Sequence, residues 1–272
     1  MRSARQGFTL VELVIVITLI GVVATFGSLL LSRVVGSTLT GAQRTELASA
    51  ADAGARRIAR ELQAALPNSI RVTTGSGTAF IEFVPVLDAG RYRRDVSASG
   101  SGDPLDFENP ADASFDVLGG PASASGSVWL VINNLGFSGA DVYAGSNRRG
   151  SVTLSGGGSA IQFAATGAFP AGGSTSNRFF LEGAPVTLAC DVATGRWRRF
   201  SGYAFQASQP TDASAAPLAS ASSAVLIEGI SACAVSYTQP QANLGVVGLQ
   251  IQVTQSGDTV RLVHQVAVDN TP

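Results

Sequence analysis

The feature of this sequence that most restricts its fold is an apolar run near the N-terminus, from Phe8 to Leu31. Within this run the only formal charge is carried by Glu12. An α-helix of this length, at about 1.5 Å per residue, extends roughly 36 Å, whereas the hydrocarbon core of a bilayer is about 30 Å thick. The run is therefore expected to form a helix that can span a membrane.

A short basic leader precedes the apolar run. Residues 1–7 contain Arg2 and Arg5 and end in Gly7. A secretory signal peptide is cut after its apolar region, at small residues spaced as in Ala-x-Ala. Here the small residue stands before the apolar run, so the expected cleavage point lies on the other side, between Gly7 and Phe8.

Glu12 is the second unusual feature of the run. An unpaired carboxylate in hydrocarbon costs on the order of a few kcal/mol, so an intramembrane acid is a functional-site hypothesis. After cleavage the α-amine of Phe8 would supply a cation. Because a helix is stiff, Glu12 is better placed to pair with the amine of a neighbouring copy, which implies assembly of many helices side by side. The alternative is a single-span anchor in which Glu12 has no role.

The segment from Gly7 to Leu13, Gly-Phe-Thr-Leu-Val-Glu-Leu, resembles the class III leader of type IV prepilins and of the pseudopilins of type II secretion. This resemblance implies that a membrane-embedded prepilin peptidase cuts after Gly7 and methylates Phe8. It also implies that Glu12 registers the subunit against its neighbour during assembly.

A helical pattern continues beyond the membrane segment as far as Leu66, before Pro67. Proline disfavours helix at the residue before it and has no N–H to donate, so it is expected to end the helix. One face is apolar, with residues at steps of three and four: Leu47, Ala51, Ala55, Ile58, Leu62 and Ala65. We expect this face to pack on the chain's own globular domain. A groove-binding helix for a partner is the alternative.

From Asn68 onward the apolar period changes from helical to two, which indicates strands. The expected strands are 69–72, 79–86, 128–132, 152–154, 160–163, 178–181, 185–190, 196–203, 225–237, 244–254 and 259–268. A long helix followed by strands predicts an α+β fold, in which the amphipathic half of the helix covers an antiparallel, mostly β domain. The predicted organisation is a cleaved leader (1–7), a membrane or filament-core helix (8–31), an amphipathic helix (32–66) and a β-rich globular domain (67–272).

The chain has two cysteines, Cys190 and Cys233, and both stand in predicted strands outside the cytoplasm. In an oxidising compartment this favours one disulfide between them. A metal site is not expected, because the chain has a single histidine, His264. We interpret His264 as a packed or hydrogen-bonded structural residue.

No pattern in the chain indicates catalysis or a cofactor. Gly-x-Ser-x-Gly, a phosphate loop and a cysteine–histidine constellation are all absent from the sequence. An acidic cluster lacks the spacing and central glycine of a calcium loop, so we favour a solvated loop over a cation site: Asp103, Asp106, Glu108 and Asp112. The net charge of −1 provides no general attraction for nucleic acid. We expect a protein that is not an enzyme.

Further blocks resemble the O-type minor pilins of mannose-sensitive haemagglutinin (MSHA) pili. They are residues 57–62, 65–72, 81–85 and 90–93, Cys190-Asp191, Gly202-Tyr203, Cys233 and residues 264–272. This resemblance implies a low-abundance pilus subunit, at the tip or in the complex that starts assembly, similar in design to the larger minor pseudopilins of type II secretion.

The implied partners are the prepilin peptidase, other minor and major pilins, and an inner-membrane assembly platform. Because positive residues stay in the cytoplasm, the leader is expected there, with the C-terminal domain in the periplasm and later on the pilus or cell surface. A different class of function is a membrane-tethered binding or adhesin domain that never enters a filament. An anchored envelope enzyme is a third class, for which the sequence shows no convergent polar site.

Overall fold

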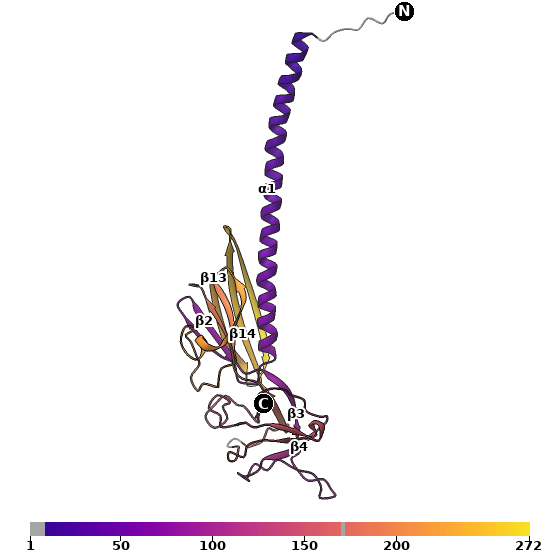
Figure 1. The fold of residues 1–272 in the computed structure, drawn as a ribbon, viewed down its shortest axis with the longest axis vertical. Helices are drawn as coiled ribbons and strands as arrows, with labels where there is room; N and C mark the ends of the chain where they lie inside the picture. The colour runs from indigo at the N-terminus through magenta and orange to yellow at the C-terminus, as the bar shows by residue number, and fades with distance from the viewer. Residues whose placement is uncertain (1–8, 170–171) are drawn as a thin grey trace, which may run out of the picture. The chain divides into compact units, whose positions relative to one another are not determined.

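The computed structural model of the chain describes residues 9–169 and 172–272, without the side chains of 29–40. The first element is one continuous helix, α1, Leu10–Gln63 (Figure 1). The chain divides into two compact units, Met1–Ser49 and Ala50–Pro272, and α1 contributes to both. The cleavage residues Gly7 and Phe8 lie outside the described part.

The helix ends slightly earlier than the sequence predicts, at Gln63 rather than Leu66. The N–H of Leu66 donates to the carbonyl of Val84 at 2.8 Å, and Ala65 forms an isolated bridge with Pro85. These backbone groups bond to a strand connection and are no longer available to a helix. Long-range pairing therefore ends α1 before Pro67 does.

In the part of the chain that the structure describes, the second unit contains three antiparallel sheets, of five, three and seven strands. The five-stranded sheet has the order β1 (Arg71–Gly75), β2 (Thr78–Phe83), β10 (Val186–Asp191), β11 (Arg196–Ser201) and β12 (Ser222–Glu228). The three-stranded sheet has the order β13 (Ile230–Gln241), β14 (Leu244–Gln255) and β15 (Asp258–Asp269). The seven-stranded sheet has the order β6 (Arg148–Arg149), β5 (Trp129–Val131), β9 (Arg178–Glu182), β3 (Val86–Tyr92), β4 (Ser114–Leu118), β8 (Ala160–Gln162) and β7 (Thr153–Ser155). Two short 3-10 helices, η1 (Gly156–Gly158) and η2 (Leu218–Ser220), complete the unit.

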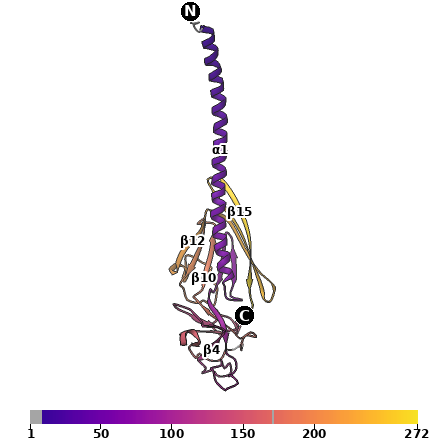
Figure 2. The same cartoon turned by 90° about the vertical axis from the view of Figure 1, so that its right-hand side faces the viewer.

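Residues 50–63 of α1 lie between strands of two sheets, and Figure 2 shows β10 and β12 on one side of them and β15 on the other. The buried face of this segment consists of Ala51, Ala55, Ile58 and Leu62, each at most 1% exposed. Glu61 accepts a hydrogen bond from Arg199 of β11. The predicted α+β fold, with an amphipathic helix on antiparallel sheets, is confirmed.

The strand pattern differs from the prediction in several places. The expected strand 225–237 is two strands, because Gly229 has a φ of 74° and turns the chain from β12 into β13. The expected strand 79–86 is interrupted at Val84 and Pro85, between β2 and β3. β3 and β4 were not predicted. Both contain aspartate, and β3 also contains Gly90, residues that are uncommon in strands.

The seven-stranded sheet is buried on both faces at β9. Phe179 and Leu181 belong to an aromatic-rich cluster with Phe115 and Tyr92. The next side chain along the strand, Phe180, packs in a separate cluster with other apolar residues. This double burial explains why β9 reads as a continuous apolar run rather than as an alternating one.

Candidate functional site

Thr9 immediately precedes α1 and contacts Glu12 in the first turn of the helix. The hydroxyl of Thr9 accepts a hydrogen bond from the N–H of Glu12 at 3.2 Å, and its carbonyl accepts one from Leu13 at 3.1 Å. Thr9 and Glu12 have the Ser/Thr-x-x-Glu spacing of a capping box. A carboxylate in the first turn is also favoured by the positive end of the helix dipole. This spacing is present in the sequence itself.

Glu12 is exposed in the structure. Across residues 9–169 and 172–272 the ion pairs do not include its carboxylate. The expected partner, the α-amine of Phe8 in another copy, lies outside the described residues. The pairing of Glu12 with that amine therefore stays a prediction.

The helix that carries Glu12 exposes its apolar side chains. Leu10–Ser28 has a mean hydropathy of 2.5, and by length and composition it is able to cross a membrane. Its most exposed large apolar residues are Leu10 at 79%, Val23 at 69%, Val11 at 66%, Phe26 at 65% and Ile20 at 61%. Contiguous apolar surface of this extent marks contact with a membrane or with other chains.

The hydroxyl groups of this helix are satisfied by its own backbone. Thr18 donates to the carbonyls of Val14 and Ile15 at 2.9 and 2.8 Å. Thr25 donates to Gly21 at 2.7 Å, and Ser28 donates to the carbonyl of Thr25 at 2.9 Å. Polar groups in hydrocarbon need internal partners, so these contacts suit a membrane environment.

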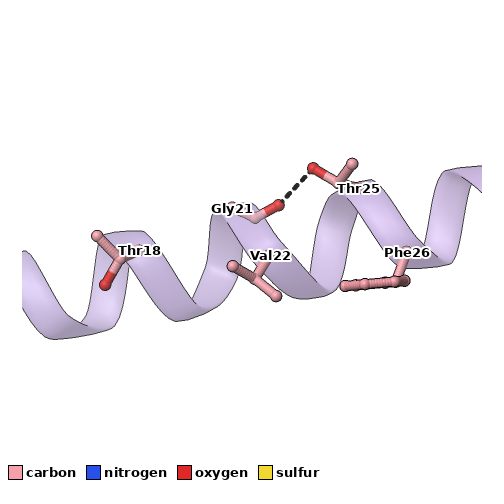
Figure 3. Close-up of a pocket in the computed structure, with 5 residues that line it drawn as sticks. All are labelled: Thr18, Gly21, Val22, Thr25 and Phe26. Carbon is pink, nitrogen blue, oxygen red and sulfur yellow. Dashed lines mark hydrogen bonds between the residues drawn. The ribbon is translucent and has the colours of Figure 1, made fainter.

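One side of the apolar helix is hollowed at Gly21. Figure 3 shows the hollow lined by Thr18, Gly21, Val22, Thr25 and Phe26. A Cβ added at Gly21 would meet no atom within 4 Å. Small and hydroxyl side chains in a membrane helix let a second helix approach closely.

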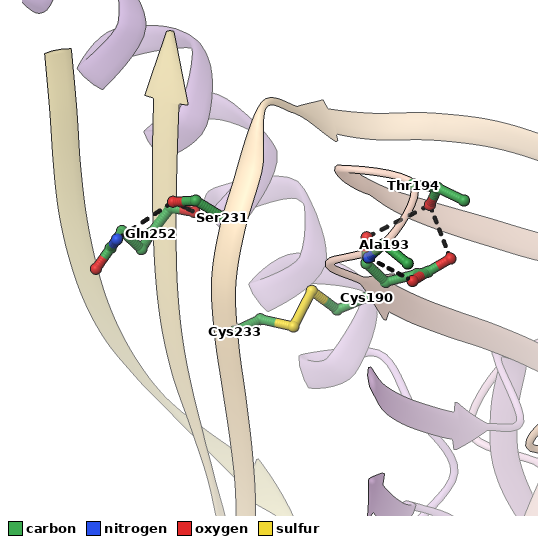
Figure 4. The surroundings of a disulfide bond; sticks show 7 residues. Cys190, Ala193, Thr194, Ser231, Cys233 and Gln252 are labelled. Carbon is green, nitrogen blue, oxygen red and sulfur yellow. Dashed lines mark hydrogen bonds between the residues drawn. A yellow bond between two sulfur atoms is a disulfide. The ribbon is translucent and has the colours of Figure 1, made fainter. Parts of the chain in front are cut away.

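The structure joins the two cysteines that the sequence pairs. Cys190 of β10 and Cys233 of β13 form a disulfide, which Figure 4 shows as a yellow sulfur–sulfur bond. Cys190 is fully buried. The bond links the five-stranded sheet to the three-stranded sheet, whose strands otherwise belong to separate hydrogen-bonded ladders.

The acidic cluster of residues 103–112 bonds to its own loop. The side chain of Asp112 accepts a hydrogen bond from the N–H of Asp106 at 2.7 Å, and Asp106 accepts one from Glu108 at 2.9 Å. Asp103 accepts a hydrogen bond from the hydroxyl of Ser114 at 2.6 Å. Within the described residues, no group of three or more His, Cys, Asp or Glu side chains is arranged to hold a metal ion.

His264 has the structural contact that we expected. Its Nε2 lies 3.1 Å from the Oδ1 of Asp52, and Asp52 also pairs with Arg56 at 2.7 Å. The contact ties β15 to α1.

Two buried glutamates were not foreseen from the sequence. Glu82 is bonded to Arg71 at 2.5 Å and to the hydroxyl of Tyr203 at 2.9 Å. Burial raises the pKa of Glu82, while its bonds to Arg71 and Tyr203 oppose that shift. Tyr203 also bonds to Thr187, so this network connects β1, β2 and β10. Strand periodicity places such side chains on a face but does not show that the face is covered.

The second glutamate, Glu182 of β9, is fully buried. Both of its carboxyl oxygens lack a hydrogen-bond partner among the described residues. Burial raises the pKa of Glu182 well above its ordinary value of 4.5, and the charge of Arg148 opposes the shift only in part. Burial therefore favours the neutral form of the Glu182 carboxyl group.

Comparison with known proteins bears on the N-terminal segment. Residues 2–28 match the family model described as the prokaryotic N-terminal methylation motif. The match supports a protein of the type IV pilin or pseudopilin class. It also supports processing by prepilin peptidase, and an apolar N-terminal helix with this motif fits membrane anchoring followed by entry into a pilus or pseudopilus. No curated protein matches the chain, and no solved structure does.

Proposed function

We propose that this protein is a minor type IV pilin of the MSHA-like O type, a structural subunit of a pilus or of the complex at its tip or starting point. The observation that carries the proposal is the methylation motif over residues 2–28 on a helix whose apolar side chains are exposed. A helix of this kind has to find an apolar environment outside its own chain, first a membrane and then a bundle of similar helices.

In the proposed mechanism the peptidase removes residues 1–7 after Gly7 and methylates the new N-terminus at Phe8. The subunit then waits in the inner membrane, with its β-rich domain in the periplasm. During assembly Glu12 pairs with the amine of a neighbouring subunit. The exposed carboxylate in the first turn of α1 supports this role, since it is available to a partner from another chain. The role of the subunit is structural rather than catalytic.

The first test is the mass of the N-terminal peptide from protein extracted from the membranes of its native host. We expect a peptide that begins at N-methylated Phe8. A peptide that begins at Met1, or one cut downstream of the apolar run, would overturn the pilin proposal. Either result would favour a membrane-tethered or exported binding domain, which needs no cleavage at Gly7.

A second test separates assembly from processing. In Glu12→Gln the carboxylate is replaced by a neutral amide of similar size. We expect normal cleavage after Gly7 and at least a tenfold loss of the subunit from sheared filaments, because an unpaired intramembrane charge costs a few kcal/mol. The matched control is Thr18→Val, which removes a polar atom that bonds only within the helix. Equal incorporation of Glu12→Gln and the wild type would contradict the proposed role.

A type II secretion minor pseudopilin is the second candidate, because the same motif and helix support both classes. Deletion of the gene distinguishes them in the native host. Loss of surface pili with normal protein secretion favours the pilin. Accumulation in the periplasm of enzymes that are normally secreted favours the pseudopilin.

A further inference from the structure

The seven-stranded sheet is inserted into the chain between two strands of the five-stranded sheet. The chain leaves the five-stranded sheet after Phe83, the last residue of β2, and returns to it at Val186, the first residue of β10. Among the described residues, the strands of the inserted sheet, β3 to β9, all lie between these two points. Residues 84–85 and 183–185 connect the two sheets, and we call these two segments the hinge.

The two segments of the hinge run side by side. On one side of them Phe83 pairs with Val186, and on the other side Val86 pairs with Glu182. Between these two pairs the strands are interrupted. Short segments at the ends of regular elements are the places where packed parts of a protein pivot. The inserted sheet can therefore move about the hinge without loss of either strand ladder.

Backbone hydrogen bonds keep the hinge closed. The donor and acceptor residues are Leu66 and Val84 at 2.8 Å, Val86 and Ala64 at 3.0 Å, and Gly183 and Pro85 at 3.1 Å. Each of these bonds has at least one partner in the hinge or next to it. Their N–H groups therefore report whether the hinge is closed or open.

Glu182 ends β9 directly before the hinge. It lies two residues from Phe180 and shares its face of the strand, and Phe180 packs in an apolar cluster with Val84 of the hinge. Its cross-strand neighbours, Val86 and Trp129, do not titrate. Glu182 is 0% exposed, and among the described residues neither of its carboxyl oxygens has a hydrogen-bond partner. The carboxyl group is thus covered at the hinge without polar compensation.

Two titratable neighbours face Glu182. The positive charge of Arg148 on β6 favours the ionised form, but its guanidinium donates to the carbonyl of Val142 at 2.5 Å and lies 3.6 Å from the centre of the Phe205 ring. Burial raises the pKa of Tyr143 well above its ordinary value of 10.0, so Tyr143 stays neutral. Further charges act on these two neighbours: Asp141 on Arg148, and Arg71 and Glu82 on Tyr143.

We propose that Glu182 is a proton switch that controls the hinge of the inserted sheet. While its carboxyl group is protonated, the apolar contacts at the hinge close over it. A buried charge without a bonded partner is costly, so loss of the proton opens the hinge and lets water reach the carboxylate. Opening frees the inserted sheet, residues 86–182, to change its orientation relative to the five-stranded sheet.

The direction of the switch follows from the two protonation equilibria. Burial raises the pKa of Glu182 in the closed state, whereas the solvated carboxyl of the open state has its ordinary value of 4.5. The open state therefore loses the proton first as pH rises. Above a pH of about 4.5 the opening constant grows by up to about tenfold per pH unit, until the pKa of the closed state is passed. Acid closes the hinge, and higher pH opens it.

The test is amide hydrogen exchange of the full-length protein in detergent micelles at pH 5, 6, 7 and 8. The reporters are the N–H groups of Leu66, Val86 and Gly183. Exchange of an unstructured peptide of the same sequence, measured at each pH, corrects for the intrinsic rate. We expect the protection of the reporters to fall by about tenfold or more between pH 5 and pH 7. Low urea should speed exchange in β14 and leave the reporters unchanged, because the hinge opens locally.

Two variants make the test specific. Glu182→Gln keeps the size of the side chain but cannot ionise, so the protection of the reporters should no longer depend on pH. Glu82→Gln is the matched control. Glu82 is buried on β2, on the other side of the hinge, and is bonded to Arg71, so this variant should keep the fall in protection.

A third variant decides the question if Glu182→Gln does not fold. Arg148→Gln removes the cation that favours the ionised form of Glu182. The pKa of the closed state should then rise further, so protection should continue to fall to a higher pH than in the wild type.

Three results would overturn the proposal. One is a wild type in which the protection of the reporters does not change with pH. Another is a fall in protection that persists in Glu182→Gln. The third is that the reporters match β14 in both protection and urea dependence, which would show that Glu182 acts only on global unfolding.

Discussion

Two stretches of helix α1 differ in whether their large apolar side chains are exposed or buried. In Leu10–Ser28 the large apolar residues are exposed, with Leu10 at 79% and Val23 at 69%. In residues 50–63 the corresponding side chains, Ile58 and Leu62, are fully buried. The first stretch is apolar all round and needs an environment from outside the chain. The second is apolar on one face and finds its environment in the chain's own sheets.

The polar side chains of the two stretches also differ in where their hydrogen-bond partners lie. In the first stretch the hydroxyls of Thr18 and Thr25 bond to carbonyls of the same helix. In the second, Asp52 bonds to His264 of β15, and Glu61 bonds to Arg199 of β11. Among the described residues, the hydroxyl groups of the first stretch thus bond locally, whereas tertiary contacts hold the second. Substitutions should therefore affect the two stretches very differently.

The largest expected difference comes from truncating an apolar side chain in each stretch. Leu62→Ala leaves a cavity, and the free energy of unfolding of the second unit should fall by about 2–5 kcal/mol. Ile17→Ala, the matched control, removes a side chain that is 57% exposed and should leave that free energy unchanged. Urea unfolding followed by tryptophan fluorescence measures both. An equal loss in Ile17→Ala would show that the two stretches do not differ in this way.

Removal of the disulfide should act on the second unit alone. The double variant Cys190→Ser, Cys233→Ser opens a cross-link between residues separated by 43 positions. We expect a loss of about 2–4 kcal/mol in the free energy of unfolding. Reductant should lower the melting temperature of the wild type and leave the double variant unchanged. Cleavage after Gly7 should be the same in both proteins. A change in cleavage would show that the disulfide also affects the first unit.

The pH dependence of stability should separate the two kinds of glutamate. Because the pKa of Glu182 is raised in the folded state, the unfolded chain loses this proton first as pH rises above about 4.5. Ionisation of the unfolded state then lowers the stability of the wild type until the folded pKa is passed. Glu182→Gln removes this contribution, so it should be more stable than the wild type at pH 8 and similar to it near pH 4.

Glu82→Gln is the control for the Glu182 variant. Glu82 is bonded to Arg71, so its neutral substitute leaves a part-buried guanidinium without its charged partner. The pKa of Glu82 is raised as well, so its ionisation has the same pH dependence as that of Glu182. We expect the loss of the Arg71 pair to outweigh this contribution and to destabilise Glu82→Gln at pH 8. Thermal melting at pH 4, 6 and 8 measures both variants. If Glu182→Gln were no more stable than the wild type at pH 8, this assignment would be contradicted.

The smallest expected effects come from two glycines of α1. A Cβ at Gly54 would lie 2.9 Å from the carbonyl oxygen of Leu226 and would also press on Ile227. Gly54→Ala should therefore destabilise the second unit by about 1–3 kcal/mol. A Cβ at Gly21 meets nothing within 4 Å, so Gly21→Ala should stabilise the helix by about 0.5–1 kcal/mol. Thermal melts followed by circular dichroism should show melting temperatures that shift in opposite directions in the two variants. Shifts in the same direction would contradict the predicted difference between the two stretches.

Local patterns made part of this structure predictable. The apolar run and the position of Glu12 predict the exposed N-terminal helix, and Thr9 with Glu12 already has capping spacing. The steps of three and four from Ala51 to Leu62 predict the buried face of the same helix. The disulfide could be predicted because the chain has two cysteines and both were placed in an oxidising compartment. Each of these features depends on residues close together in the chain or on composition.

Other features had no local signal. β3 carries Asp88 and Gly90, so its pairing with β9 could not be read from its own composition. Glu182 follows three buried apolar residues, but nothing nearby in sequence shows that its carboxyl is covered too. The end of α1 at Gln63 depends on a bond between Leu66 and Val84. These outcomes come from strands that meet across long separations.

Local sequence patterns are sufficient to predict that residues 10–28 form a helix with an apolar surface and that Glu12 stands in its first turn. Hydrophobicity and capping act over a few residues, so they are legible in any local window. Long-range contacts cover residues 50–63 with β11, β12 and β15, and among the described residues they bury Glu182 without a hydrogen-bond partner. Strand order and burial are set by contacts between distant segments, which no single window of the sequence contains.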